Sequence, residues 1–377
     1  MKIKRISALL LAAVAVVSFT SCKKSRPKGA DQKIKYDLSA DPTSLDPQIA
    51  SDTPSLIAVQ AVYEGLTRLD SSGEARPGVA ESWESSGGTQ FTFHLRANAR
   101  WSDKKYGTVT AADFVYAFRR ALDPQTGSAT CPQMFCIKNA KAIHAGTLAA
   151  DSLGAVAKDA KTLVVTLEYA CPDFPKIAAS AVFMPCNQKF FEKTAGRYGL
   201  DATYLLSNGP FDLDSSDDWS HDKSLRLTRS SNYTGSAAVL PSMIDFTIGS
   251  KVSGEQALKT GAVDAAPVSS SRISSLRKAG CTLSSSQNTV WGLCFNTQSD
   301  IFKNEKMREA FTQAFSRKSV LSHLPEGASA AESVFLPGTT LNGAAFQPAD
   351  GRFYLKQDAG AAQTLAAGMR ELNLQSL

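Results

Sequence analysis

Residues 91–122, FTFHLRANARWSDKKYGTVTAADFVYAFRRAL, place a strand pattern just before a helix pattern, and this order decides the fold class. In FTFHLR the apolar side chains alternate with other residues, as expected of a strand with one buried face. After a polar turn, Thr110 and Asp113 have the spacing of a capping box, which predicts the start of a helix. Apolar residues then recur at helical spacing, at Phe114, Val115, Phe118 and Leu122. The stretch therefore predicts a fold in which a sheet packs against helices.

The same two patterns recur along the rest of the chain. Residues 162–167 form a β-branched run typical of a strand, and residues 304–315 and 358–372 carry apolar stripes typical of helices. Asn208 and Gly209 predict a tight turn with positive φ before the next strand. Strands and helices alternate without an internal repeat, which favours an α/β or α+β class.

Composition and charge fit a globular protein of two or three domains. The chain has 377 residues, of which 43% are hydrophobic and 20% are charged. Its net charge is +6, but three uncompensated basic residues lie within residues 1–21, which leaves +3 for the remainder. So small a charge argues against a nucleic-acid partner. The composition also excludes collagen-like, mucin-like and polytopic membrane proteins.

The first 21 residues are typical of an export signal. A basic head at 1–5 precedes an uncharged run at 6–19, and the small residues Thr20 and Ser21 follow. As a helix the run would span about 21 Å, which is too short for the roughly 30 Å core of a membrane. We therefore expect residues 1–21 to be a cleaved signal peptide.

Cys22 follows directly and resembles the cysteine at which bacterial lipoproteins are cleaved and acylated. Several acyl chains on one residue give stable anchoring, so the protein is expected in the cell envelope, held outside the cytoplasmic membrane by lipid on Cys22. Residues 22–33 would then be a polar tether. An ordinary secretory signal with an incidental cysteine is the alternative, because Phe19 stands where such sites usually have Leu.

Export makes the remaining cysteines candidates for disulfide bonds. There are six: Cys131, Cys136, Cys171, Cys186, Cys281 and Cys294. Neighbours in sequence would pair as 131–136, 171–186 and 281–294, but six cysteines allow 15 connectivities. The alternative is that several are small buried side chains. No C-x-x-C motif occurs, so zinc-ribbon and thioredoxin chemistry lack their ligand spacing.

One set of motifs has the order found in serine acyl enzymes. Ser102 and Lys105 form S-x-x-K, Ser230 begins S-x-N, and Lys259 begins K-T-G. However, Ser102 lies in a predicted polar turn, whereas the chemistry needs it at the start of a helix. The four histidines are scattered, and no H-E-x-x-H, G-x-S-x-G or phosphate-binding glycine loop occurs. We expect no enzyme activity, no metal site and no cofactor.

Taken in order, a series of short motifs resembles the bacterial extracellular solute-binding proteins of family 5, the peptide-binding type. They are SLDP (44–47), YEGLT (63–67), PGVAESW (77–83), FTFHLR (91–96), WSD (101–103), TAADFV (110–115), RALDP (120–124), NAKAI (139–143), SNGPF (207–211), GAVD (261–264) and FNT (295–297). The resemblance implies an α/β fold with an α+β insertion, a periplasmic-binding-protein-like clamp of type II with two lobes.

The resemblance also implies a division of the chain. Lobe I would comprise residues 34–62 and 187–288, with an inserted α+β domain at 63–186, and residues 289–377 would form part of lobe II. Family members are usually longer, so the second lobe is expected to be incomplete. It would then expose apolar side chains at Phe311, Phe315, Leu321 and 334–336.

Family members hold a peptide mainly through its backbone, and six positions here match their ligand-facing segments. These are Ser51, Asp52, Thr53, Thr130, Trp291 and Phe295. Asp52 would attract a peptide amine or, alternatively, cap a helix together with Thr53. Trp291 would stack on the ligand or pack between the lobes.

The implied function is a monomeric lipoprotein that captures oligopeptides between its lobes and delivers them to the permease subunits of an ABC importer. A variant that binds nickel, haem or a sugar is the same-class alternative, although the histidines are too sparse for a metal site. The alternative from another class is a surface interaction lipoprotein that is derived from this family and no longer transports.

Overall fold

The computed structural model describes residues 32–235, 238–249, 252–284, 290, 292–324, 328–331, 335, 339–341, 344–346 and 359–376. The expected signal peptide at 1–21, Cys22, nearly all of the expected tether and Trp291 lie outside these residues. Within the described chain, no helix has the length and the apolar content needed to cross a bilayer.

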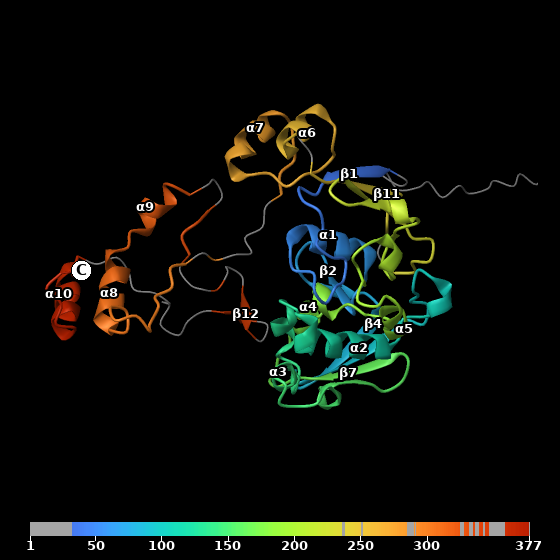
Figure 1. Cartoon of the computed structure of the whole chain (residues 1–377), viewed down its shortest axis with the longest axis horizontal. Helices are drawn as coiled ribbons and strands as arrows, with labels where there is room; N and C mark the ends of the chain where they lie inside the picture. Colours follow the sequence, from blue (N-terminus) through green and yellow to red (C-terminus); the bar gives the residue numbers. More distant parts are fainter. Residues whose placement is uncertain are drawn as a thin grey trace, which may run out of the picture.

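Strands and helices alternate along the described chain (Figure 1). The strands are β1 (Lys33–Asp37), β2 (Thr67–Leu69), β3 (Ala75–Pro77), β4 (Ala80–Ser86), β5 (Gln90–Leu95), β6 (Ala155–Ala157), β7 (Thr162–Thr166), β8 (Phe211–Asp212), β9 (Trp219–Ser220), β10 (Ser224–Arg229), β11 (Met243–Thr247), β12 (Thr340–Leu341) and β13 (Ala344–Ala345). The α-helices are α1 (Thr53–Val62), α2 (Ala111–Leu122), α3 (Ala140–His144), α4 (Phe174–Ile177), α5 (Gln188–Lys193), α6 (Gly254–Thr260), α7 (Ile273–Lys278), α8 (Glu305–Ala314), α9 (Arg317–Leu321) and α10 (Ala361–Glu371). Short 3-10 helices include η1 (Lys104–Tyr106), η3 (Cys131–Met134) and η5 (Ala181–Phe183).

One sheet joins the beginning of the described chain to residues 211–247. β1 pairs in parallel with β11, β10 pairs antiparallel with β11 and β8, and β9 adds to β10. Leu225 and Leu227 on β10 are buried, while Arg226 between them is exposed. This alternation gives the sheet one core face and one solvent face.

A second sheet contains β4, β5, β7 and β6 in that order, all antiparallel. On β5 the buried residues are Phe91, Phe93 and Leu95, so the predicted strand and its apolar face are confirmed. α2 begins with the predicted capping box of Thr110 and Asp113 and packs on β6 and β7. The predicted succession of strand, polar turn and helix is therefore confirmed.

Aromatic side chains fill the core around the second sheet. The ring centre of Phe174 on α4 lies 5.3 Å from that of Phe91 and 6.0 Å from that of Phe183. A single cluster of buried residues has members between Leu38 and Ile248 and includes residues of both sheets. The two sheets therefore share one hydrophobic core. That shared core fixes the segment between β1 and α1 relative to the second sheet.

In the last part of the chain, α8 and α10 pack side by side, well apart from both sheets (Figure 1). Asn304 caps α8 by accepting a hydrogen bond from Met307 N at 3.1 Å, and Gly368 of α10 lies against the Met307 side chain. The two predicted helices near 304–315 and 358–372 are thus confirmed. Phe311 and Phe335 are 41% and 42% exposed, as expected for this part of the chain. Phe315 and Leu321 are half-buried, and the remaining positions of 334–336 lie outside the described residues.

The prediction of a positive φ at Asn208 and Gly209 is wrong, since neither residue adopts one. A Cβ on Gly209 would lie 2.6 Å from the carbonyl carbon of Val62 and 2.7 Å from Tyr63 N. Gly209 N donates to Val62 O at 2.9 Å. Glycine is needed here because the loop lies directly against the end of α1, not because the turn is left-handed.

Candidate ligand-binding site

The expected ligand residues Ser51, Asp52 and Thr53 lie at the amino end of α1. Asp52 is its N-cap, and Oδ1 accepts a hydrogen bond from Ser55 N at 2.9 Å. Oδ2 accepts from the hydroxyls of Thr43, at 2.5 Å, and Ser55, at 2.6 Å. Ser51 and Thr53 are exposed, while Asp52 is half-buried. Of the two alternatives for Asp52, the structure shows the cap, and its carboxylate oxygens are occupied within the protein.

The environment of Asp52 favours its ionised form. Partial burial raises the pKa of Asp52, but hydrogen bonds from Ser55 and Thr43 outweigh it and leave the pKa below its ordinary value. The positive end of the α1 dipole favours the same charge. Asp52 therefore holds the amino end of α1 in place with a charged cap.

Replacing Asp52 by Ala is expected to lower the free energy of unfolding by about 0.5–2 kcal/mol at pH 7, because the cap is lost. Folding lowers the pKa of Asp52, so this stability is complete above the unfolded pKa of about 3.9 and is lost as pH falls through the folded pKa. Urea unfolding of both proteins from pH 7 to pH 2 measures the difference. Asp52→Asn keeps an acceptor and should retain most of the stability at pH 7. Equal stability of Asp52→Ala and the wild type at pH 7 would contradict the cap.

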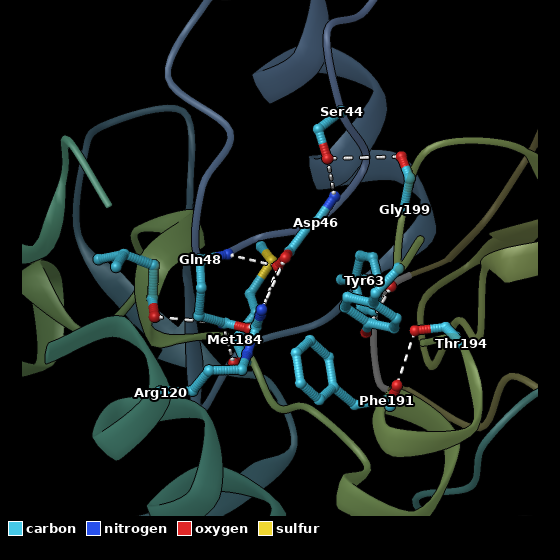
Figure 2. Close-up of polar contacts among 11 residues, drawn as sticks. Ser44, Asp46, Gln48, Tyr63, Arg120, Met184, Phe191, Thr194 and Gly199 are labelled. Atoms are coloured by element: carbon cyan, nitrogen blue, oxygen red, sulfur yellow. Dashed lines mark hydrogen bonds and ion pairs between the residues drawn. The ribbon is translucent and has the colours of Figure 1, made fainter. Parts of the chain in front are cut away.

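The segment that carries these residues is anchored by a buried ion pair between Asp46 and Arg120 of α2 (Figure 2). Arg120 Nη1 donates to Asp46 Oδ2 at 2.7 Å, and Nη2 donates to Oδ1 and to Gln48 Oε1. Gln48 N donates to Asp46 Oδ1 at 3.0 Å, and Gln48 Nε2 donates to Met184 O at 2.9 Å. These contacts join the approach to α1 to two separate parts of the chain.

Aromatic rings enclose the guanidinium of Arg120. It lies 4.5 Å from the ring centre of Phe191 and 5.4 Å from that of Tyr198, whose hydroxyl is 2.8 Å from the hydroxyl of Tyr63. Burial lowers the pKa of Arg120, but the facing carboxylate of Asp46 more than offsets this and leaves it above its ordinary value. Arg120 is therefore a permanent buried charge whose partner is Asp46.

A second buried ion pair lies at the carboxyl end of α1. Arg96 Nη2 donates to Glu64 Oε2, and the Tyr233 hydroxyl donates to Glu64 Oε1 at 2.7 Å. The backbone of Glu64 exchanges two hydrogen bonds with the Asn208 side chain, at 3.1 and 2.9 Å. Burial raises the pKa of Glu64, although Arg96 and Tyr233 act in the opposite direction. Both ends of the segment from 46 to 64 are thus fixed by buried charges.

The other expected ligand residues lie elsewhere. Thr130 precedes η3, and its buried Oγ1 has no partner among the described residues. The Phe295 ring lies 4.9 Å from that of Phe302 and 6.4 Å from that of Phe311 on α8. Figure 1 places α8 far from α1, so the structure does not bring Phe295 to residues 51–53. Trp291 lies outside the described residues.

None of the expected disulfide bonds is formed, because all six cysteines are free thiols in the structure. The structure therefore contains none of the predicted pairs 131–136, 171–186 and 281–294. Cys131, Cys136 and Cys186 are buried, and burial raises the pKa of the Cys186 thiol to about 12. They pack as small apolar side chains, which was the alternative, whereas Cys171 and Cys281 are half-buried and Cys294 is exposed.

Side chains of two of the three motifs of a serine acyl enzyme, S-x-x-K and K-T-G, are engaged in other contacts. Ser102 Oγ accepts from Ser207 N at 3.2 Å, and the ammonium group of Lys105 pairs with Asp103. The ammonium group of Lys259 contacts Glu255 at 2.6 Å. Among the described residues, no group of three or more His, Cys, Asp and Glu could hold a metal ion.

Sequence patterns did not reveal the two buried ion pairs. Asp46 and Arg120 are 74 positions apart, and Glu64 and Arg96 are 32 apart. Each of the four lies in a motif quoted above, SLDP, RALDP, YEGLT or FTFHLR. A charged residue within a short motif was the available signal, but it does not identify the partner.

The family model for bacterial extracellular solute-binding proteins, family 5 Middle, matches residues 74–369 of this chain. This chain belongs to that family. The resemblance read from the motifs is therefore confirmed, and the family is one of solute-binding proteins.

Curated relatives include two dipeptide-binding proteins. DppE of Bacillus subtilis (strain 168) is 29% identical over 93% of this chain and 65% of its own length. The dipeptide-binding protein of Lactococcus lactis subsp. cremoris (strain MG1363) is 31% identical over 93% of this chain and 66% of its own length. This family 5 chain thus spans slightly less than two thirds of the length of either relative.

Solved structures confirm the fold. The murein tripeptide binding protein MppA of Escherichia coli has a TM-score of 0.72 and 27% identity, and the match covers 90% of this chain and 66% of that one. Listeria monocytogenes OppA bound to peptide has a TM-score of 0.68 and 26% identity, with 92% and 70% covered. The expected α/β fold of periplasmic binding proteins is therefore confirmed for this family 5 chain.

Proposed function

We propose that this chain captures oligopeptides and delivers them to the permease subunits of an ABC importer. Its relatives include dipeptide-binding proteins and the substrate-binding domain of an oligopeptide ABC transporter from Bacillus anthracis. The observation that carries the proposal is the exposed Ser51 and Thr53, held at the capped end of α1 by buried charges. A rigid, exposed stretch of backbone suits binding by main-chain hydrogen bonds.

In this proposal the peptide lies along residues 51–53 and is bound mainly through its backbone. Asp52 acts as the helix cap that fixes this backbone, because its oxygens already accept three hydrogen bonds. Affinity then depends little on the peptide's side chains, which suits a carrier of many peptides.

The proposed division into lobes follows the two sheets. Residues 34–62 and 187–288 form lobe I, residues 63–186 form its inserted domain, and residues 289–377 belong to lobe II. Supporting this division, the sheet of β4 to β7 lies entirely within 63–186, while the other sheet combines β1 with β8 to β11. Closure of the lobes by a hinge motion would enclose the peptide.

We also propose that the protein is a monomer that works at the envelope, anchored by lipid on Cys22 after removal of residues 1–21. The basic head, the short apolar run and the cysteine support this proposal. A role in binding rather than in catalysis is supported by the family and by the engaged side chains of the serine motifs.

Native mass spectrometry with tri-alanine tests the peptide site. The wild-type protein should retain the peptide, and Ser51→Trp should weaken retention about tenfold or more, because an indole at this position blocks the approach of a peptide backbone. A loss of one or two backbone hydrogen bonds, at about 0.5–1.5 kcal/mol each, gives this magnitude.

Ser71→Trp is the matched control, since Ser71 is also exposed but lies in the turn between β2 and β3. It should bind tri-alanine as the wild type does. Retention that is equal in both variants, or absent from the wild type, would refute the proposed site.

A further inference from the structure

A cavity of about 400 Å³ lies between the carboxyl end of α1, the β2–β3 hairpin and the loop before β11. This volume falls within the usual range for small-molecule sites, roughly 300–1,000 Å³. Among the expected ligand residues, none lines this cavity. It is therefore a separate feature from the proposed peptide site.

Most of the wall of the cavity is apolar. Met184, Phe211, Val239 and Leu240 are among its lining residues. The charged groups are Arg68 on β2 and Glu64, and the other polar side chains include those of Gln60, Thr67 and Tyr233. An apolar wall with a few polar groups is the ordinary composition of a site for a small amphipathic molecule.

The charged groups of the wall are unequally satisfied. Both carboxylate oxygens of Glu64 are occupied, one by Arg96 and the other by the Tyr233 hydroxyl. By contrast, the buried Nε of Arg68 has no hydrogen-bond partner among the described residues. Arg68 is half-buried, and its positive charge lowers the pKa of Glu64, so it is the cation of the wall with which a ligand anion can pair.

The neighbouring strand carries a second arginine, which already has a partner. Arg68 on β2 stands directly opposite Arg76 on β3 in the antiparallel ladder. Arg76 is neutralised by Asp70, whose Oδ2 lies 2.7 Å from its Nε. Arg76 therefore adds little charge to the cavity, and Arg68 is the arginine that lines it.

We propose that this cavity binds a free carboxylic acid with an unbranched apolar chain. The carboxylate pairs with the guanidinium of Arg68, which offers a fork of donors suited to two oxygens. The chain lies along Met184, Phe211 and Leu240, where part of its apolar surface is removed from water.

Isothermal titration calorimetry with sodium octanoate tests the proposal, with octylamine as the cationic probe of equal chain length. The wild-type protein should bind octanoate and not octylamine. Arg68→Gln should weaken octanoate binding about tenfold or more, which corresponds to about 1.4 kcal/mol for a charged hydrogen bond. Arg76→Gln, on the facing strand and outside the cavity wall, is the matched control and should bind as the wild type does.

Leu240→Trp gives a second readout that leaves Arg68 in place. The half-buried Leu240 lines the cavity, so a larger side chain should fill it and abolish octanoate binding. The proposal is overturned if the wild type binds no octanoate, if it binds octylamine equally well, or if Arg68→Gln binds octanoate as tightly as Arg76→Gln does. Ser51→Trp should leave octanoate binding unchanged, so failure of the peptide site would be seen separately.

Discussion

Replacing Arg120 by Met is expected to lower the free energy of unfolding by about 3–5 kcal/mol. The substitution keeps much of the apolar length of the side chain but leaves the Asp46 carboxylate buried without its cation. A buried, unpaired carboxylate is strongly disfavoured, and Gln48 would also lose the donor to its Oε1. Urea unfolding at pH 7 measures the loss as a fall in the transition midpoint.

An exposed ion pair provides the matched control for this change. Arg226 Nε lies 4.0 Å from Asp245 Oδ1, and the Arg226 side chain is 51% exposed. Arg226→Met should therefore cost only about 0–1 kcal/mol. A comparable loss in both variants would show that the position of the charge within the core is unimportant.

A double variant distinguishes the effect of the unpaired Asp46 carboxylate on stability from the effect of the packing lost with Arg120. Asp46→Asn in the Arg120→Met background removes the buried carboxylate while keeping an oxygen for Gln48 N. If the unpaired charge causes most of the loss, this protein should be more stable than Arg120→Met alone. If instead the contacts of Arg120 with Phe191 and Tyr198 dominate, the second substitution should bring no gain.

The same anchor connects stability to binding. Asp46 lies a few residues before Ser51. Its ionic partner Arg120 comes from α2, and Gln48, which binds both Asp46 and Arg120, also donates to Met184 O. Loosening it would free the backbone at residues 51–53, which the peptide proposal requires to be rigid. We therefore expect Arg120→Met to weaken tri-alanine retention at temperatures where it remains folded.

Local features of the fold were predictable because they depend on residues close in sequence. The strand at FTFHLR follows from alternation, and the start of α2 follows from the capping box of Thr110 and Asp113. α8 and α10 follow from apolar stripes of helical period, and Asn304 caps α8. Each of these signals acts over one or two turns of chain, which a single sequence displays directly.

Features that depend on contacts between distant segments could not be predicted in the same way. The role of Gly209 comes from the approach of Val62, and composition alone suggested a left-handed turn instead. The partner of Asp46 comes from a helix 74 positions later. Spacing likewise suggested disulfide bonds for cysteines that the fold buries as thiols, such as Cys131 and Cys186. At the candidate site, the sequence located Asp52 but did not show that its carboxylate would be occupied.

The second large effect is expected for Gly199→Ala, at about 2–5 kcal/mol of lost stability. Gly199 has φ of +72°, which costs an alanine about 1–2 kcal/mol. A Cβ there would also lie 2.3 Å from Asp46 N and 2.7 Å from the carbonyl carbon of Leu45. Overpacking of this kind adds about 1–3 kcal/mol, and backbone atoms cannot rotate away as side chains do. The shift would also disturb two hydrogen bonds to Gly199 O. One comes from Leu45 N at 2.7 Å, and the other comes from the Ser44 hydroxyl at 3.4 Å, as Figure 2 shows.

Gly196 lies three residues earlier and isolates the contribution of the close approach. Its φ is +85°, but a Cβ there would meet nothing within 4 Å. Gly196→Ala should therefore cost only the conformational part, about 1–2 kcal/mol. The difference between the two variants, measured by urea unfolding, reports the contact between Gly199 and Asp46. Equal losses of unfolding free energy in the two variants would mean that the backbone near Asp46 shifts at little cost to admit the methyl group. The segment carrying Ser51 would then be less rigid than the peptide proposal requires.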